Sequence, residues 1–374
     1  MRCNHDMKWV LGLITVASAA AIGPGIASLD GVENDGFIKV AIKHRQSPNL
    51  AKRELEMPLD KDSVAYYADI ELGSPEQKVS VSLDTGSSDL WVYSGQTQDG
   101  GYSETSSSSS KNLSEPFSIS YAIGSAKGYY VTDTVGFDNA HIDDFQFAVV
   151  NSRTSGTSAD GILGLGLVSN EATDKTYDNF PKRLVDEGVI KKNMYSLYLD
   201  DIESSSGSIL FGAIDKAKYK GELGSIPLTS DTQFRVNFTV NGTTTSGVLD
   251  CGSTLMYLPD DAVSAIANKL GAQWDNDRGA YFLSNRPSDS LVFDFDGTQV
   301  SVPTQEYILD SHTVFPGASL PYVLGVLPTS QSSGMVILGD TFLRSAYVVF
   351  DLDYRKVSIA QASYRSNTDI QVMT

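Results

Sequence analysis

One short pattern occurs twice in this chain, as Val81–Ser88 and again as Gly247–Thr254. Each copy is an apolar run that ends on an aspartate, Asp84 or Asp250, followed by a small residue, a glycine and hydroxyl side chains. Burying an ionised carboxylate is costly unless partners compensate for the lost water. Glycine allows a tight turn and close backbone approach, and hydroxyls can donate hydrogen bonds to carboxylate oxygens. Each copy is therefore expected to hold its aspartate in a hydrogen-bonded turn.

The repetition extends beyond the aspartates. Ile162-Leu163-Gly164 follows Asp84, and Ile337-Leu338-Gly339 follows Asp250 at a similar distance along the chain. Two long-range copies indicate two related halves rather than a solenoid of short repeats. Because each half supplies one aspartate, we expect a site at the interface between two lobes, where clefts commonly form.

Composition narrows the classes of function. The 374 residues leave room for two or three domains, and 41% hydrophobic residues are ample for a packed core. The formal net charge is −18. Such an acidic chain argues against nucleic acid as a partner, since that affinity comes from Lys and Arg. It suits a protein that works in acid, where protonation of carboxylates reduces self-repulsion.

Motifs for other hydrolases are absent from the sequence. There is no His-Glu-x-x-His, Cys-x-x-Cys or Gly-x-Ser-x-Gly, so zinc and serine hydrolases find no support. Of the two cysteines, Cys3 lies in a segment we expect to be removed, which leaves Cys251 without an internal disulfide partner. We expect neither a metal nor an organic cofactor.

The amino-terminal region has the pattern of targeting and processing segments. Residues 1–21 combine a basic start, an apolar run and small residues typical of a signal peptide; a membrane helix would need a longer run. Residues 22–53 are interpreted as a propeptide, because residues 36–53 contain five Lys or Arg, no acid, and end in the dibasic pair Lys52 and Arg53. A flexible basic tail is the alternative. We hypothesise that this segment covers the cleft until cleavage, and that acid loosens it as carboxylates are protonated.

From Val64 the sequence has β patterning. Alternating residues predict strands at 66–72 and 77–83, and a hairpin of strands 117–121 and 128–132 with a tip at 122–127. Helical spacing predicts helices at 182–190 and 259–270. We place the amino-terminal lobe at 54–220 and the carboxy-terminal lobe at 221–374.

Three sequons become glycosylation candidates if the chain is secreted. They begin at Asn112, Asn237 and Asn241. The last residues of the sequence form no apolar tail, so a GPI anchor is not expected.

With these motifs in this order, the chain resembles the pepsin-like aspartic endopeptidases. It is most similar to the secreted yeast enzymes of the candidapepsin type, through stretches such as Tyr195–Leu199 and Leu343–Leu352, and the similarity runs from about Val64 to Tyr364. The resemblance implies an all-β, bilobal fold of two related β lobes, with a few short helices and the active site in the cleft between them. It also implies secretion as a zymogen.

The resemblance assigns the catalytic role to Asp84 and Asp250. Two carboxylates a few ångströms apart cannot both ionise cheaply, so the pair holds one proton in acid, which is the known behaviour of aspartic proteases. The ionised member can then take a proton from water while the protonated member polarises the scissile carbonyl. The resemblance further implies dyad support from Thr85, Ser87, Cys251 and Ser253, substrate contacts from Gly86, Tyr121, Ala122, Ile123 and Gly252, and a Trp91 indole beside the flap tyrosine Tyr121.

The expected partners are polypeptides bound in extended form, as in strand addition. A membrane anchor is not expected, and nothing argues for more than a monomer. Three features depart from the family: Cys251 replaces the usual Thr or Ser, Ala122 stands where Gly often follows the flap Tyr, and the usual disulfides of the secreted yeast enzymes are missing.

Two other functions remain open at this point. The first is a catalytically weakened or inactive peptide-binding homologue, for which Cys251 and the missing disulfides would be signs of relaxed function. The second is a secreted all-β glycosidase that uses the two carboxylates. The glycosidase accounts for two acids but not for their Gly-Ser surroundings or for the duplication.

Overall fold

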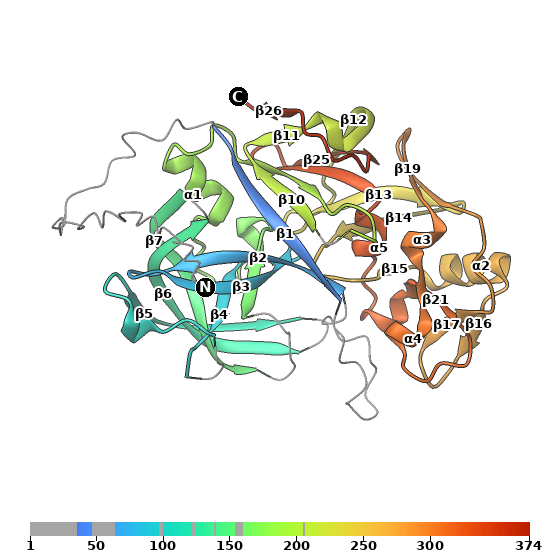
Figure 1. Ribbon diagram of the computed structural model, residues 1–374, viewed down its shortest axis with the longest axis horizontal. Helices are drawn as coiled ribbons and strands as arrows, with labels where there is room; N and C mark the ends of the chain where they lie inside the picture. The colour runs from blue at the N-terminus through green and yellow to red at the C-terminus, as the bar shows by residue number, and fades with distance from the viewer. Residues whose placement is uncertain are drawn as a thin grey trace, which may run out of the picture. The chain divides into compact units, whose positions relative to one another are not determined.

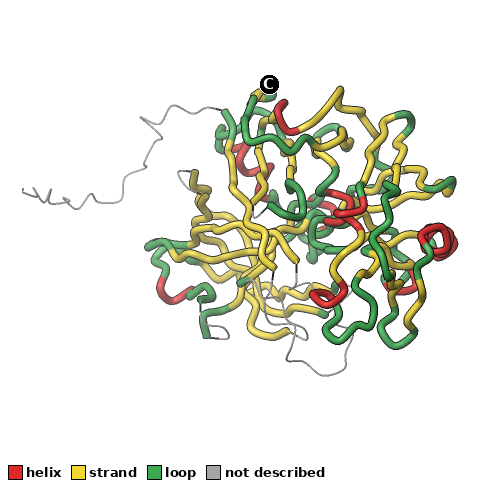
Figure 2. The backbone as a smooth tube through the Cα atoms, turned by 45° about the vertical axis from the view of Figure 1, so that its right-hand side comes forward, coloured by secondary structure: helices red, strands yellow, loops and turns green. Residues whose placement is uncertain are grey.

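The computed structural model describes residues 36–46, 64–96, 100–121, 124–137, 140–153, 160–204 and 206–374. Strands are the most frequent regular element of the described backbone, and helices are short segments between them (Figure 2). The elements up to residue 215 are β1 (Ile38–Gln46), β2 (Val64–Leu72), β3 (Gln77–Asp84), β4 (Leu90–Tyr93), β5 (Lys111–Ser120), β6 (Ser125–Phe137), β7 (Ala140–Arg153), β8 (Gly161–Gly164), α1 (Phe180–Asp186), β9 (Met194–Tyr198), β10 (Ser206–Phe211) and β11 (Ala213–Asp215).

The remaining strands and helices lie between Tyr219 and Val372. They are β12 (Tyr219–Pro227), β13 (Arg235–Val240), β14 (Thr243–Leu249), β15 (Met256–Leu258), α2 (Asp260–Leu270), β16 (Gln273–Asp275), β17 (Ala280–Leu283), β18 (Leu291–Phe295), β19 (Thr298–Val302), α3 (Thr304–Tyr307), β20 (Ile308–Asp310), α4 (Ser311–Val314), β21 (Tyr322–Leu324), β22 (Val326–Pro328), β23 (Ile337–Leu338), α5 (Asp340–Leu343), β24 (Ala346–Asp351), β25 (Lys356–Ala362) and β26 (Ile370–Val372). Single 3-10 turns lie at Glu104–Ser106, Val168–Asn170, Lys216–Lys218 and Thr329–Gln331.

The two halves repeat one arrangement of strands. In the first half β3 runs parallel to β8, and β8 pairs antiparallel with β4. In the second half β14 runs parallel to β23, and β23 pairs antiparallel with β15. The Ile-Leu-Gly repeats therefore lie beside the strands that carry the aspartates, with Leu83 opposite Leu163 and Leu249 opposite Leu338. This pairing confirms the bilobal all-β expectation and explains why the triplets are repeated.

One sheet crosses between the halves. Its 13 strands run in the order β12-β25-β24-β9-β10-β1-β2-β3-β8-β4-β7-β6-β5. The second half adds a 7-stranded sheet, β19-β18-β13-β14-β23-β15-β22, and a 4-stranded sheet, β16-β17-β21-β20. Figure 1 shows β1 in blue, running beside both β2 and β10. The amino-terminal basic segment thus supplies an interior strand of this sheet.

Local sequence explains the individual elements. In β3 the residues alternate, so that Val79, Val81 and Leu83 are buried while the intervening serines are more exposed. This is the period of two that a strand requires. Helix α2 buries Val263 and Ile266 and ends at Gly271, whose φ of +70° forms the left-handed cap. Predicted helix 259–270 is confirmed; predicted helix 182–190 is displaced, since α1 spans Phe180–Asp186 with the Asn179 side chain as its amino-terminal cap.

The hairpin prediction needs one correction. Its tip was expected at 122–127, but β6 already begins at Ser125 and pairs with Ser120. The turn is closed by the Tyr121 amide, which donates to the Gly124 carbonyl at 2.9 Å, and Gly124 has a φ of +88°. Glycine adopts that backbone conformation without strain, which permits the shorter turn.

Candidate active site

Asp84 stands at the carboxyl end of β3, where the strand gives way to a glycine turn. The Gly86 amide donates to Asp84 Oδ1 at 2.8 Å, and the Ser87 hydroxyl donates to Oδ2 at 2.5 Å. The side chain is 5% exposed. Two donors from the same turn thus compensate for the burial of this carboxyl.

Asp250 follows β14 and has the same two partners. The Gly252 amide donates to its Oδ1 at 2.8 Å, and the Ser253 hydroxyl donates to its Oδ2 at 2.6 Å. The Asp250 amide in turn donates to the Leu338 carbonyl at 3.1 Å, which fixes the loop against β23. The predicted hydrogen-bonded turns are present in both halves, with the same atoms in the same roles.

The two carboxyl groups face one another. A Cβ added to Gly86 would lie 2.8 Å from Asp250 Cγ, and a Cβ added to Gly252 would lie 2.4 Å from Asp84 Oδ1. Each glycine therefore leaves room for the carboxyl group of the other half. A side chain at either position would collide with the opposite aspartate, so the two loops need glycine to come together.

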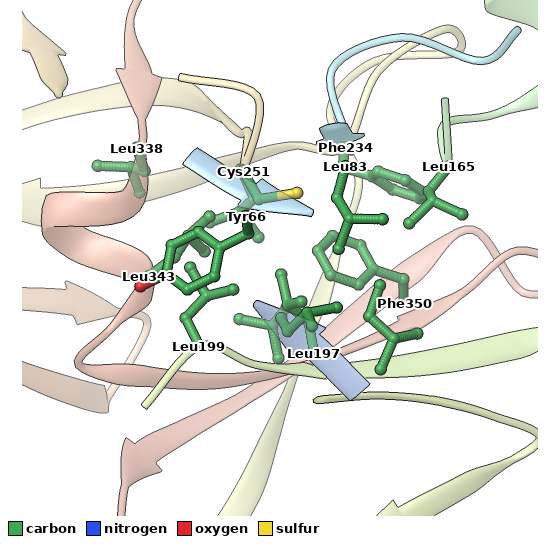
Figure 3. Close-up of a cluster of buried hydrophobic side chains, with 14 of the residues drawn as sticks. Tyr66, Leu83, Leu165, Leu197, Leu199, Phe234, Cys251, Leu338, Leu343 and Phe350 are labelled. Carbon is green, nitrogen blue, oxygen red and sulfur yellow. The ribbon is translucent and has the colours of Figure 1, made fainter. Parts of the chain in front are cut away.

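Thr85 connects the two aspartate loops. Its hydroxyl donates to the Leu249 carbonyl at 2.9 Å and accepts from the Cys251 amide at 3.0 Å. The Cys251 side chain is buried, and Figure 3 shows its sulfur among Tyr66, Leu83 and Leu338. Burial, together with the nearby carboxyl groups, raises the pKa of this thiol well above its ordinary value. The thiol is therefore neutral and packs as an apolar group.

A hairpin formed by β5 and β6 brings Tyr121 to the cleft. The Trp91 indole N–H donates to the Tyr121 hydroxyl at 2.7 Å, as the flap assignment predicts. Burial and the charge of Asp84 raise the pKa of Tyr121, so its hydroxyl stays protonated. Ala122 and Ile123, the other predicted flap contacts, lie outside the described residues.

Both aspartates line one cleft of about 360 Å³. One wall combines the flap residues Ile119 and Tyr121 with Asn170 and Ala172. The second half supplies the apolar residues Leu255, Tyr257, Leu309, Val314 and Met335, together with polar ones such as Thr254, Gln331 and Ser332. The two carboxyl groups together with apolar residues from both halves suit a chain that presents peptide groups to the aspartates and side chains to the walls.

The sequence interpretation missed most of these wall residues. Leu255 and Tyr257 directly continue the second aspartate motif, so their position after Ser253 could have indicated them. Leu309, Val314 and Met335 carry no local signal, because only the tertiary fold brings them to the cleft. Asn170 was also missed, although its side-chain amide donates to the Gly86 carbonyl at 3.1 Å and so supports the Asp84 turn.

Two further carboxyl groups lie behind the wall formed by residues 170–177. Asp89 is fully buried and accepts hydrogen bonds from the Tyr130 and Tyr177 hydroxyls, both at 2.9 Å, and from the Ala172 amide at 2.8 Å. Glu171 accepts from the Tyr177 amide at 2.9 Å, and burial raises its pKa to about 8. Burial likewise raises the pKa of Asp89. Both acids therefore accept hydrogen bonds from the residues around them, and these hydrogen bonds hold the cleft wall in place.

The other predicted residues are distributed as follows. Lys52 and Arg53, the dibasic pair, lie outside the described residues, as do the signal segment 1–21 and residues 22–35. The sequon residues Asn112, Asn237 and Asn241 are all exposed. Within the described ranges, no group of three or more His, Cys, Asp or Glu side chains is arranged to hold a metal ion. No helix in those ranges has the length and apolarity needed to cross a membrane.

Comparison with known proteins agrees with this geometry. The pattern of the eukaryotic aspartyl protease family matches residues 65–362, and the chain belongs to that family. It is 42% identical over 339 residues to candidapepsin-4 of Candida albicans, which covers 83% of this chain and 80% of the relative. It is 37% identical over 403 residues to candidapepsin-1 of the same species, covering 99% of both. A crystal structure of aspartic proteinase from Irpex lacteus superposes with a TM-score of 0.74 at 25% identity, over 88% of this chain and 98% of that one.

Proposed function

We propose that Asp84 and Asp250 together activate a water molecule for attack on a peptide bond. The protein is an aspartic endopeptidase by family, and the observation that carries the catalytic assignment is the mutual approach of the two carboxyl groups across Gly86 and Gly252. Like charges this close cannot both ionise, so one proton is held between them in acid. The pair titrates as a unit, and neither aspartate is assigned as the base.

The chain's own groups supply each further requirement. The ionised carboxyl takes a proton from water, the protonated carboxyl polarises the carbonyl, and the proton then passes to the leaving amine. Ser87 and Ser253 fix the outer oxygens, which leaves the inner Oδ1 atoms directed at the reacting groups. No covalent enzyme intermediate forms, because water is the nucleophile.

The substrate is a polypeptide bound in extended form. The Tyr121 hairpin lies along one wall, where its strand β5 can hydrogen-bond the peptide backbone, as in strand addition. The apolar lining residues Leu255, Tyr257, Leu309, Val314 and Met335 accommodate large apolar side chains near the scissile bond. Closure of the hairpin over the peptide excludes water and strengthens the interactions inside.

The chain is further proposed to be a secreted, glycosylated zymogen that acts as a monomer. The named relatives include "Secreted aspartic protease 4" and "Secreted aspartic protease 8" of Candida albicans. In this proposal residues 1–21 are a signal peptide, residues 22–53 a propeptide cut after Lys52-Arg53, and the lobes meet near residue 220, inside β12. Asn241 is the favoured glycan site, since it is exposed at the turn between β13 and β14.

A direct assay tests the proposal. Denatured casein is incubated with the processed protein between about pH 3 and 6, the range in which a shared-proton dyad operates. We expect hydrolysis that Asp84→Asn and Asp250→Asn each reduce by at least about a thousandfold, with the folded state retained. The inactive-homologue alternative predicts no hydrolysis by the unmodified protein, and hydrolysis that survives both substitutions would contradict the dyad.

A further inference from the structure

His44 lies on β1, the interior strand that belongs to the proposed propeptide. Its ring stacks on the Tyr66 ring of β2, with centroids 4.8 Å apart and planes inclined by 12°. Its Nδ1 lies 3.0 Å from the Ser204 carbonyl. A carbonyl oxygen can only accept, so Nδ1 carries the hydrogen. The remaining ring nitrogen, Nε2, is buried without a hydrogen-bond partner among the described residues.

The charged groups around this ring come from several elements. Arg344, directly after α5, is 1% exposed and repels a positive charge on His44. Its guanidinium binds Glu306 of α3, with Nε donating to Oε2 at 2.5 Å and Nη2 to the Glu306 carbonyl at 2.8 Å. Asp340 on α5 is also buried, and burial raises its pKa well above the ordinary value. Arg344 is thus already paired with Glu306, and burial disfavours the charged form of Asp340.

Two more carboxylates lie in the loop that presents the Ser204 carbonyl. Asp201 accepts the Ser204 amide at 3.0 Å, and Asp200 accepts the Ser204 hydroxyl at 3.3 Å. Both carboxylates accept hydrogen bonds within that loop. The loop contacts His44 through the Ser204 carbonyl. On the adjacent position of β1, Lys43 forms an exposed ion pair with Asp69.

Protonation of His44 would therefore be unfavourable while β1 is part of the sheet. It would turn buried Nε2 into a charged donor with no acceptor, close to the Arg344 guanidinium. Burial, with Arg344 as a smaller contribution, accordingly lowers the pKa of His44. In a released strand the ring has an ordinary pKa of about 6.5. The released state binds more protons below that pH, so acid favours release of β1.

We propose that His44 is an acid-operated latch that keeps β1 in the sheet at neutral pH and favours its departure as the surroundings become acidic. This inference rests on the proposed zymogen and adds a residue that senses pH. It differs from loosening by protonation of carboxylates. Exposed carboxyl groups ordinarily titrate near pH 4, whereas a histidine acts from about pH 6.5 downward. The two contributions therefore fall in separate pH ranges.

The test measures release of the strand after the chain has been cut. The full chain carries Asp84→Asn so that it cannot digest itself. It is cleaved after Arg53 with a protease that requires the dibasic pair Lys-Arg. The fraction of the amino-terminal fragment that stays bound to the body is then measured from pH 7.5 to 3.5. His44→Phe keeps the stacked ring but cannot be protonated, and His44→Gln keeps a hydrogen-bond donor without a charge. His141→Phe, at an exposed histidine, is the matched control.

We expect half-release between about pH 5 and 6.5 for the unsubstituted fragment, and a fall of about one pH unit or more in both His44 variants. His141→Phe should leave the curve unchanged. Superimposed curves for His44→Phe, His44→Gln and the reference would overturn the latch, as would a fragment that stays bound throughout. Casein hydrolysis at pH 4 by the cut chain with native Asp84 is measured in parallel. Its absence from a cut chain that has released the fragment would refute the proposed protease function.

Discussion

Thr85 and Cys251 occupy equivalent places in the two aspartate motifs, but they do not contribute equally. The Thr85 hydroxyl makes two hydrogen bonds to the opposite loop, through the Leu249 carbonyl and the Cys251 amide. Cys251 places a buried thiol at the corresponding position. A thiol is a weak, long hydrogen-bond donor, so the connection between the loops depends mainly on one side chain.

This asymmetry predicts that Cys251→Thr stabilises the protein. A hydroxyl at residue 251 can donate to the backbone of the Asp84 loop, as Thr85 does in the other direction. One added hydrogen bond is worth about 1 kcal/mol, or a rise of roughly 2 °C in the melting temperature. The measurement is thermal unfolding at pH 5. Cys251→Ala, which removes the thiol without adding a hydroxyl, is the control and should unfold earlier; an unchanged or lower melting temperature for Cys251→Thr would contradict the prediction.

At the scale of the element, the Tyr121 hydroxyl connects the β5–β6 hairpin to Trp91 beside the dyad. Tyr121→Phe removes the hydroxyl that accepts from the Trp91 indole, while both carboxyl groups remain. The lost hydrogen bond, worth about 1 kcal/mol, positions the hairpin over the substrate. Its loss should lower kcat/KM for a peptide substrate roughly fivefold to tenfold. Tyr129→Phe is the matched control, because the Tyr129 hydroxyl of the same hairpin donates to Glu104 at 2.9 Å, not to Trp91. Equal losses in both variants would argue against a specific Tyr121 contact.

The loop between β8 and α1 shows where sequence interpretation reaches its limit. Asp84, Asp250, their serines and both glycines could be predicted, because each motif is local and occurs twice. Asp89 and Glu171 could not, since nothing in their neighbouring residues distinguishes a buried acid from a surface one. The Asp89 donors, the Tyr130 and Tyr177 hydroxyls, come from distant parts of the chain. The Glu171 donor, the Tyr177 amide, lies in the same loop, but only the fold buries the two together.

Glu171 gives this loop a pH dependence of known sign. Its pKa is about 8 in the folded chain and near 4.3 when unfolded, so between those values the folded state binds the extra proton. Stability is therefore full below about pH 4.3 and is lost as the pH rises toward 8. Glu171→Gln removes that proton dependence. We expect its melting temperature to exceed that of the unsubstituted protein by roughly 2 °C or more at pH 7.5, and by much less at pH 4.

The control for Glu171→Gln is a substitution of a nearby acid that is not buried. Glu115 is paired with Lys175 on the surface, and exposed pairs contribute little to stability. Glu115→Gln should therefore shift the melting temperature by less than about 1 °C at both pH values. If the two glutamine variants behave alike at pH 7.5, burial of Glu171 is not the cause of alkaline instability.

At the scale of the whole molecule, β1 is the element that sequence interpretation placed least well. Its basic composition led to the hypothesis of a cover over the cleft, but residues 38–46 pair with β10 and β2 inside the 13-stranded sheet, and none of them lines the cleft. Residues 47–63 lie outside the described residues. The pairing joins β1 to a strand that is remote in sequence, and such a long-range partner leaves no local pattern to recognise.

The proposed removal of this interior strand has a testable consequence for folding. Ile42 is fully buried in the main hydrophobic cluster, whereas its neighbour Ala41 is exposed. Ile42→Asp loses apolar burial and adds a charge, at a cost of more than about 3 kcal/mol to the uncut chain. The proposed mature protein begins after Arg53 and does not contain this residue. We therefore expect a secreted yield reduced by at least about tenfold, but a mature fraction with unchanged kcat/KM and melting temperature. Ala41→Asp, on the outer face of the same strand, should leave the yield intact. A mature fraction of Ile42→Asp that melts earlier would mean that β1 stays in the working protein, and the boundary at Arg53 would then be wrong.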